Sequence, residues 1–296
     1  MVKLAKYTLA ITLMFTLTAC SQNEEPSFNE TTNIIVVEEQ EMSQEALYLF
    51  SEESDDASVE EGEAEYVAIG IDYVNRQEEL SELKEKISSV EIGDRVRFGG
   101  HDWSILDIQD GKALILSDKA LSERRFRTSV PRVVVEDPTI TWETSSFRRY
   151  LNGTFYENTF TSDEKKLIVE TKIVTNSNPW FGARGGNDTM DKIFLLSYEE
   201  VVKYFGDSGQ LDEVPEQLPA GRREAAYIDD QYNELRIVKN IETGLPSLWW
   251  LRSPGYSLEA AHIRNDGRIY MGMHYNEHLY TIFGGIRPAL WLDLDV

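Results

Sequence analysis

Short runs of apolar or alternating residues, separated by glycine-containing turns, dominate the chain after residue 90. Runs of this kind cover Arg95–Phe98, Trp103–Ile108 and Ala113–Ser117, with Gly99-Gly100 and Asp110-Gly111 between them. Alternation with a period of two is typical of strands that bury one face, and Gly and Asp are typical of the turns between them. The pattern therefore predicts an antiparallel meander over these residues.

Helix signals follow this meander. Thr161 with Glu164, and Ser197 with Glu200, have the spacing of capping boxes, in which side-chain oxygens accept hydrogen bonds from backbone N–H groups at the start of a helix. A third short helix is predicted over Ser145–Leu151. Further strands are predicted at Leu248–Arg252, Ala261–Ile263, Arg268–Met271 and Ile286–Leu292. The mixture predicts an α+β fold.

Two other stretches have their own patterns. Residues 206–246 are rich in Gly, Pro and charged residues, and we interpret them as loops. Residues 76–90 place Leu80, Leu83 and Ile87 at the three- and four-residue spacing of an amphipathic helix. This helix would form either a stalk or the first element of the folded domain.

The first 20 residues have the layout of an export signal. Lys3 and Lys6 precede an uncharged apolar run that ends at Ala19, too short to span a bilayer comfortably. The run closes with Leu17-Thr18-Ala19-Cys20, which resembles the lipobox of bacterial lipoproteins. The resemblance implies a signal peptide over residues 1–19 and lipid attachment, such as palmitate, at Cys20. Because Cys20 is the single cysteine of the chain, the chain cannot form an intramolecular disulfide.

Charge separates a tether from a domain. Residues 21–90 contain 20 acidic and three basic residues, which accounts for most of the net charge of −23. Residues 20–75 are therefore predicted to form an extended, disordered spacer that disfavours nucleic acid and an anionic membrane surface. All six Trp lie beyond residue 100, so we expect residues 91–296 to form the domain with a hydrophobic core.

Several motifs in this domain resemble one bacterial family. They are Phe98-Gly99-Gly100-His101-Asp102-Trp103, Trp142 with Arg148–Asn152, Ile193–Ser197, Trp249-Trp250-Leu251-Arg252-Ser253-Pro254-Gly255 and Arg287-Pro288-Ala289-Leu290. Together they resemble a domain of unknown function that is common in surface proteins of Gram-positive bacteria. That domain is in turn similar to the C-type-lectin-like fold of the formylglycine-generating enzymes. Those enzymes act through paired cysteines, so the resemblance does not extend to their oxidase activity.

The calcium-dependent lectins of this fold use clustered acidic and amide side chains. The nearest counterpart here is Arg264-Asn265-Asp266, whose arginine would oppose a bound cation. We interpret Asn265–Arg268 as a turn between two strands instead, because these residues tolerate positive φ angles.

Two strings resemble catalytic motifs. His274-Tyr275-Asn276-Glu277-His278 matches the H-x-x-E-H pattern of inverted zinc proteases, so a metal site formed by His274, Glu277 and His278 is the alternative hypothesis. Its flanks look like strands around a loop, whereas that motif requires a helix. Gly206-Asp207-Ser208-Gly209 resembles a serine-protease nucleophile loop, but Ser208 precedes His262, the reverse of the protease order. A helix cap at Gly206 explains it better.

The predicted ligand-binding residues are Trp249, Trp250, Arg252 and Arg287. An indole face can stack on a pyranose, and guanidinium donors bind hydroxyl or carboxylate groups. The same residues could equally be structural. Because successive strand residues point to opposite faces, one indole should enter the core while the other lies nearer solvent or under a loop.

The sequence thus favours a noncatalytic lipoprotein, anchored by lipid to the outer face of the cell membrane, on the surface of a Gram-positive cell. The expected partners are the membrane, through the anchor, and cell-wall glycan or an extracytoplasmic protein, with no cofactor. The alternatives are a metal-dependent hydrolase that uses the H-x-x-E-H string and a structural envelope protein.

Overall fold

The computed structural model describes residues 74–85, 89–125, 141–216, 225–256, 260–273 and 283–295. All of them belong to one compact unit, Asp72–Val296. Its short helices and several mainly antiparallel sheets make an α+β fold, as predicted. In the described ranges, no helix is both long and apolar enough to cross a membrane.

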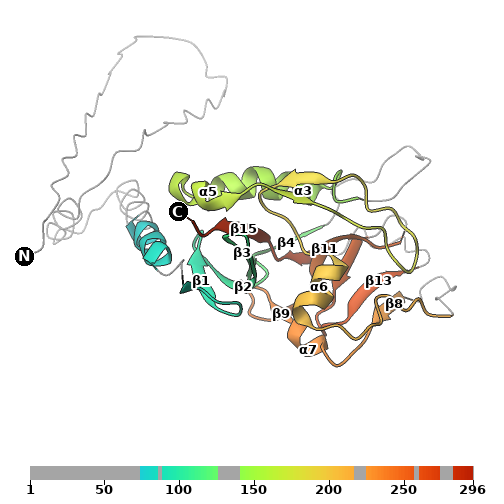
Figure 1. The fold of residues 1–296 in the computed structure, drawn as a ribbon. Coiled ribbons are helices and arrows are strands. Elements are labelled where there is room, and N and C mark those ends of the chain that lie inside the picture. The colour runs from blue at the N-terminus through green and yellow to red at the C-terminus, as the bar shows by residue number, and fades with distance from the viewer. Residues whose placement is uncertain are drawn as a thin grey trace, which may run out of the picture. The chain divides into compact units, whose positions relative to one another are not determined.

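The first sheet contains the predicted meander. Strands β1 (Arg95–Phe98), β2 (His101–Gln109) and β3 (Lys112–Ser117) are antiparallel neighbours. Gly99 and Gly100 (φ of 60° and 68°) make the first turn, where glycine is favoured because φ is positive. The sheet continues from β3 to β15 (Ala289–Asp293) and then β5 (Ile168–Val169), so the last strand of the chain lies beside the first hairpins (Figure 1).

The second sheet has six strands in the order β4-β14-β11-β12-β13-β8. Their bounds are Ser122–Arg125, Phe283–Ile286, Trp249–Pro254, Ala260–Ile263, Ile269–Met273 and Ala225–Ile228. The pair β11 and β14 is parallel, and the other neighbours are antiparallel. Every residue of β11 and of β12 is buried, which requires both faces of the sheet to be covered.

One predicted strand is wrong. Ile286–Leu292 was expected to be continuous, but β14 ends at Ile286 in the second sheet and β15 begins at Ala289 in the first. Pro288 lies between them, and proline cannot donate a ladder hydrogen bond. Its carbonyl oxygen instead accepts a hydrogen bond from the backbone N–H of Ser117. The segment Arg287-Pro288 therefore carries the chain from one sheet to the other.

The helices begin where the sequence predicts. Helix α5 (Ser162–Leu167) has the complete capping box of Thr161 and Glu164, and α6 (Tyr198–Phe205) that of Ser197 and Glu200. The predicted third helix is α3 (Ser146–Tyr150), which continues into η2 (Leu151–Phe155) and α4 (Tyr156–Thr159).

The segment 206–246, predicted as loops, contains regular structure. It holds β8, α7 (Asn233–Arg236) and β9 (Val238–Lys239), and Pro246 starts β10 (Pro246–Ser247), which pairs with β9. The prediction was wrong because β8 is stabilised by its distant partner β13 rather than by a local pattern. A second small hairpin joins β6 (Thr171–Ile173) to β7 (Thr189–Asp191).

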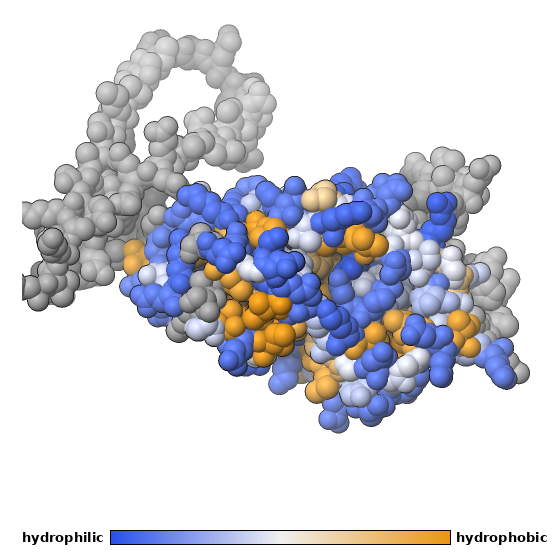
Figure 2. Space-filling model, in the orientation of Figure 1, coloured by the Kyte–Doolittle hydropathy of each residue, from blue (hydrophilic) through white to orange (hydrophobic). Residues whose placement is uncertain are grey.

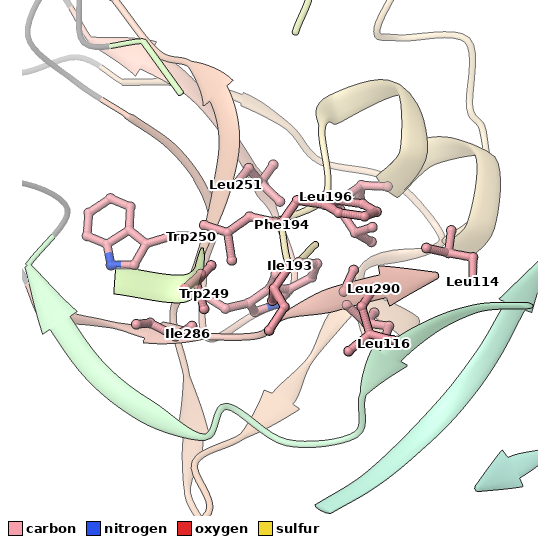
Figure 3. Close-up of a cluster of buried hydrophobic side chains, with 14 of the residues drawn as sticks. Leu114, Leu116, Ile193, Phe194, Leu196, Trp249, Trp250, Leu251, Ile286 and Leu290 are labelled. Atoms are coloured by element: carbon pink, nitrogen blue, oxygen red, sulfur yellow. The ribbon is translucent and has the colours of Figure 1, made fainter. Parts of the chain in front are cut away.

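The core lies where the two larger sheets meet. Figure 3 shows Leu114, Leu116 and Leu290 of the first sheet beside Trp249 and Ile286 of the second, with Ile193, Phe194 and Leu196 among them. Phe194 exchanges two backbone hydrogen bonds with Ala289, and the Leu196 carbonyl accepts one from Arg252. The run before α6 therefore links both sheets through its backbone as well as its side chains.

A helix over residues 74–85 precedes the meander, in agreement with the predicted amphipathic helix, whose residues 86–88 lie outside the described ranges. Leu80 and Leu83 are buried. Arg76 forms an ion pair with Glu164 and donates to the Thr159 carbonyl oxygen (2.7 Å). Glu164 also accepts from the Gly99 N–H (3.0 Å) while it caps α5. This helix is therefore packed onto the folded unit.

The surface in Figure 2 is largely hydrophilic, with hydrophobic patches between the charged residues. Large apolar side chains are exposed on the segment from α7 to β10, at Leu235, Ile241 and Leu245. Exposure in this segment contrasts with the complete burial of β11 and β12.

Candidate functional site

Several predicted residues lie outside the described ranges. They are Cys20 and the H-x-x-E-H residues His274, Glu277 and His278. Among the residues that are described, no group of three or more His, Cys, Asp and Glu side chains is arranged to hold a metal ion.

Two motif interpretations can be followed in the structure. Gly206 is the C-cap of α6, with its N–H bonded to the Val202 carbonyl, and the Ser208 hydroxyl donates to Asp230 (2.8 Å). Between β12 and β13, the Gly267 N–H (φ of 84°) bonds to the Arg264 carbonyl in a tight turn. The first segment is a helix cap and the second is a turn, as predicted.

The two predicted indoles point to opposite faces of β11, and both are buried. Trp249 is 0% exposed and donates from Nε1 to the Arg236 carbonyl (2.9 Å); Trp250 is 2% exposed and donates to the Arg124 carbonyl (3.0 Å). Figure 3 shows the Trp250 indole directed away from the cluster around Trp249. Of the two predicted positions for the second indole, the one nearer solvent is wrong, because the sheet is covered on both faces. Neither ring offers an open surface for stacking a sugar.

Arg252 joins α6 to β11. Its guanidinium forms a bidentate ion pair with Glu200, the capping residue of α6, and also donates to the carbonyl oxygens of Leu195 and Val174. All five N–H donors of an arginine are thereby used. Arg252 acts as a structural clamp with no donor left for a ligand.

Arg287 has a different environment. It is 8% exposed, and its guanidinium carbon lies 5.0 Å from the Trp249 ring centre and 5.3 Å from that of Phe205. Nε donates to the Ser117 carbonyl oxygen (2.8 Å), and Nη1 is enclosed without a hydrogen-bond partner. Burial lowers the pKa of Arg287 to about 10, although the charge of Asp118 acts in the opposite direction. The group remains a cation at neutral pH, with unused donors.

The other face of the six-stranded sheet has a row of rings that the sequence analysis missed. Trp250, His262 and Tyr270 are register partners on β11, β12 and β13. The His262 ring stacks on Tyr270 (4.3 Å between ring centres) and meets Trp250 edge-on (5.4 Å). Burial lowers the pKa of His262 to about 3, so it is neutral at physiological pH. Strand alternation alone could have placed these rings on one face, had the register been known.

Of the four predicted binding residues, Trp249 and Arg287 are in contact, whereas Trp250 and Arg252 have separate structural partners. The candidate site therefore comprises Arg287, Trp249, Phe205 and the Ser117 carbonyl, which we call the Arg287 site. It combines ring surfaces with a fixed cation, an arrangement suited to holding an anionic or hydrogen-bond-accepting group.

Comparison with known families supports a domain of unknown function, the coarser part of the predicted resemblance. The family model "Domain of unknown function (DUF6273)" matches residues 110–294, and the chain belongs to this family. No curated protein and no solved structure matches the chain.

Proposed function

We propose that this DUF6273 chain is a membrane-anchored, extracytoplasmic lipoprotein whose domain binds a ligand, glycan or protein, without catalysing a reaction. The observation that carries the binding role is the Arg287 guanidinium, which is buried beside two rings with Nη1 unpaired among the described residues. A buried donor without a partner costs free energy, and a bound ligand can supply that partner. A guanidinium and two aromatic rings can bind a ligand, but they are not the acid–base pair that catalysis would require.

The proposed location depends on the first 20 residues. Lys3 and Lys6, the apolar run and Leu17–Cys20 form a lipoprotein signal, and multiple acylation of Cys20 anchors a protein stably. The acidic stretch that follows is suited to hold the domain away from an anionic bilayer, at the surface of a Gram-positive cell. We further propose that the α+β domain has the C-type-lectin-like fold that its motifs resemble.

Metabolic labelling with a clickable fatty acid tests the anchor. The wild-type chain should be labelled and sediment with membranes, and Cys20→Ala should lose both properties. A Cys20→Ala variant that is still labelled would refute lipidation at this residue.

Capture tests the binding role. The full-length chain in detergent is applied to a glycan array and to envelope extract, with Arg287→Met and the exposed-site control Arg268→Met beside it. Capture of one ligand by the wild type and Arg268→Met, but not by Arg287→Met, is expected. Absence of any ligand in both assays would overturn the binding role. If the wild-type chain bound one equivalent of zinc and His274→Ala bound none, the metal-dependent hydrolase would be favoured instead.

A further inference from the structure

Arg287 differs from the other arginines that pack against the core. Four of those arginines form an ion pair with a carboxylate that is itself largely buried. The pairs are Arg76–Glu164, Arg148–Asp191, Arg236–Asp230 and Arg252–Glu200. Arg287 is more buried than Arg76 and Arg148, yet it has no ion pair in the described part of the chain. Among the described residues, its one hydrogen-bond partner is the neutral Ser117 carbonyl.

The nearest carboxylate is already bound elsewhere. Asp118, next to Ser117, influences Arg287 through its charge but forms an ion pair with Arg95 (3.0 Å) and accepts a hydrogen bond from the Ser104 hydroxyl. The aromatic rings attract the cation without neutralising it. An isolated buried cation is costly, so a group that brings negative charge to Arg287 would be strongly favoured over a neutral one.

The geometry also restricts how such a group can approach. The bond from Nε to the Ser117 carbonyl orients the guanidinium, and Nη1 is enclosed. A ligand therefore reaches the guanidinium at Nη2. Trp249 is completely buried, whereas Phe205, the last residue of α6, retains partial exposure, so Phe205 is the ring that a ligand can contact. A charged carboxylate oxygen accepts a hydrogen bond from a guanidinium more strongly than a hydroxyl does.

We infer that the Arg287 site binds the carboxylate of the ligand, in an ion pair with the guanidinium beside the Phe205 ring. This inference rests on the proposed binding function and assigns its ligand class. An acidic sugar and the C-terminus of a peptide both offer this group.

The test uses the full chain and probes that differ only in charge. Binding of acetate and of its neutral counterpart acetamide is measured by calorimetry at constant ionic strength, with chloride as the counter-anion. Acetate is expected to bind and acetamide is not. Arg287→Met should weaken acetate binding by about tenfold or more, as expected for the loss of a charged hydrogen-bonded pair. Arg268→Met, which replaces a partly exposed arginine outside the site, should bind like the wild type.

Two further probes extend the result. Glucuronate and N-acetylalanine then compare the two sources of carboxylate, and the tighter one identifies the ligand type. Equal binding of acetate and acetamide, or unchanged acetate binding by Arg287→Met, would overturn the inference.

The two proposals fail in different ways. If capture from envelope extract depends on Arg287 while the chain shows no selectivity for acetate over acetamide, the result would support the binding function and refute the inference that the site binds a carboxylate. Selective acetate binding without any captured envelope ligand would support the carboxylate site and refute the proposed function.

Discussion

Arg252 and Arg287 are equally buried cations near the same strand, but their surroundings differ. Arg252 is 5% exposed and uses every donor on Glu200 and two carbonyl groups, whereas Arg287 is 8% exposed and makes one hydrogen bond. Burial is therefore a poor guide to the role of an arginine. The number of donors that the fold leaves unused separates a structural cation from a candidate binding group.

The largest expected difference is in stability. Arg252→Met should lower the free energy of unfolding by about 3 kcal/mol, because it removes the partner of Glu200 and of two carbonyl groups. Arg287→Met should change it by no more than about 1 kcal/mol, because no carboxylate loses a partner and a thioether packs well against rings. Urea denaturation followed by tryptophan fluorescence measures both.

Glu200→Gln is the control for this pair of variants. It keeps the shape of the capping side chain and removes its charge, so it should lie between the two arginine variants. If Arg287→Met lowered the free energy of unfolding as much as Arg252→Met, the two arginines would not differ in role and Arg287 would be structural.

Acid should act on a third buried group, His262. The pKa of His262 is lowered from 6.5 to about 3 by burial, so its contribution to stability is complete above pH 6.5 and is lost as the pH falls from there toward 3. The slope approaches about 1.4 kcal/mol per pH unit. His262→Phe, which keeps a ring between Trp250 and Tyr270, should flatten this slope between pH 6.5 and 5.

Denaturation curves at several pH values give the slope for each variant. Because the Met variants of Arg252 and Arg287 leave His262 in place, they should retain the wild-type slope. A wild-type slope that persists in His262→Phe would assign the acid sensitivity to other groups.

The smallest expected effect concerns the ring beside Arg287. Phe205→Leu should cost about 1 kcal/mol, since it removes the contacts of this ring with Trp249 (6.2 Å) and with the guanidinium (5.3 Å). Phe205→Tyr keeps the ring and should be nearly neutral. Thermal unfolding of the three proteins provides the comparison, and equal losses for Leu and Tyr would show that the cation–ring contact contributes nothing.

Local patterns predicted local structure well. The capping boxes at Thr161 and Ser197 form as expected, because all of their hydrogen bonds lie within four residues. The Gly99-Gly100 turn and the meander around it follow from the same short-range rules. The prediction of a domain of unknown function is consistent with the family match over residues 110–294.

Long-range pairing could not be predicted in this way. The capping residues Glu164 and Glu200 also bind Arg76 and Arg252, which are 88 and 52 residues away. The apolar run from Ile286 to Leu292 did not reveal that its halves join different sheets, although Pro288 was an available signal. Alternation correctly put Trp249 and Trp250 on opposite faces, but coverage of both faces depends on tertiary packing.

The double role of Glu164 affects how the domain would respond to force. If the chain is held at Cys20, tension along the tether reaches the folded unit at the 74–85 helix. The Arg76–Glu164 ion pair would transmit this tension to the start of α5 and to the Gly99 turn. Strand β1 is at the edge of its sheet, and under such a pull we would expect it not to separate first. The clamp would spread a pull from the membrane over three elements at once.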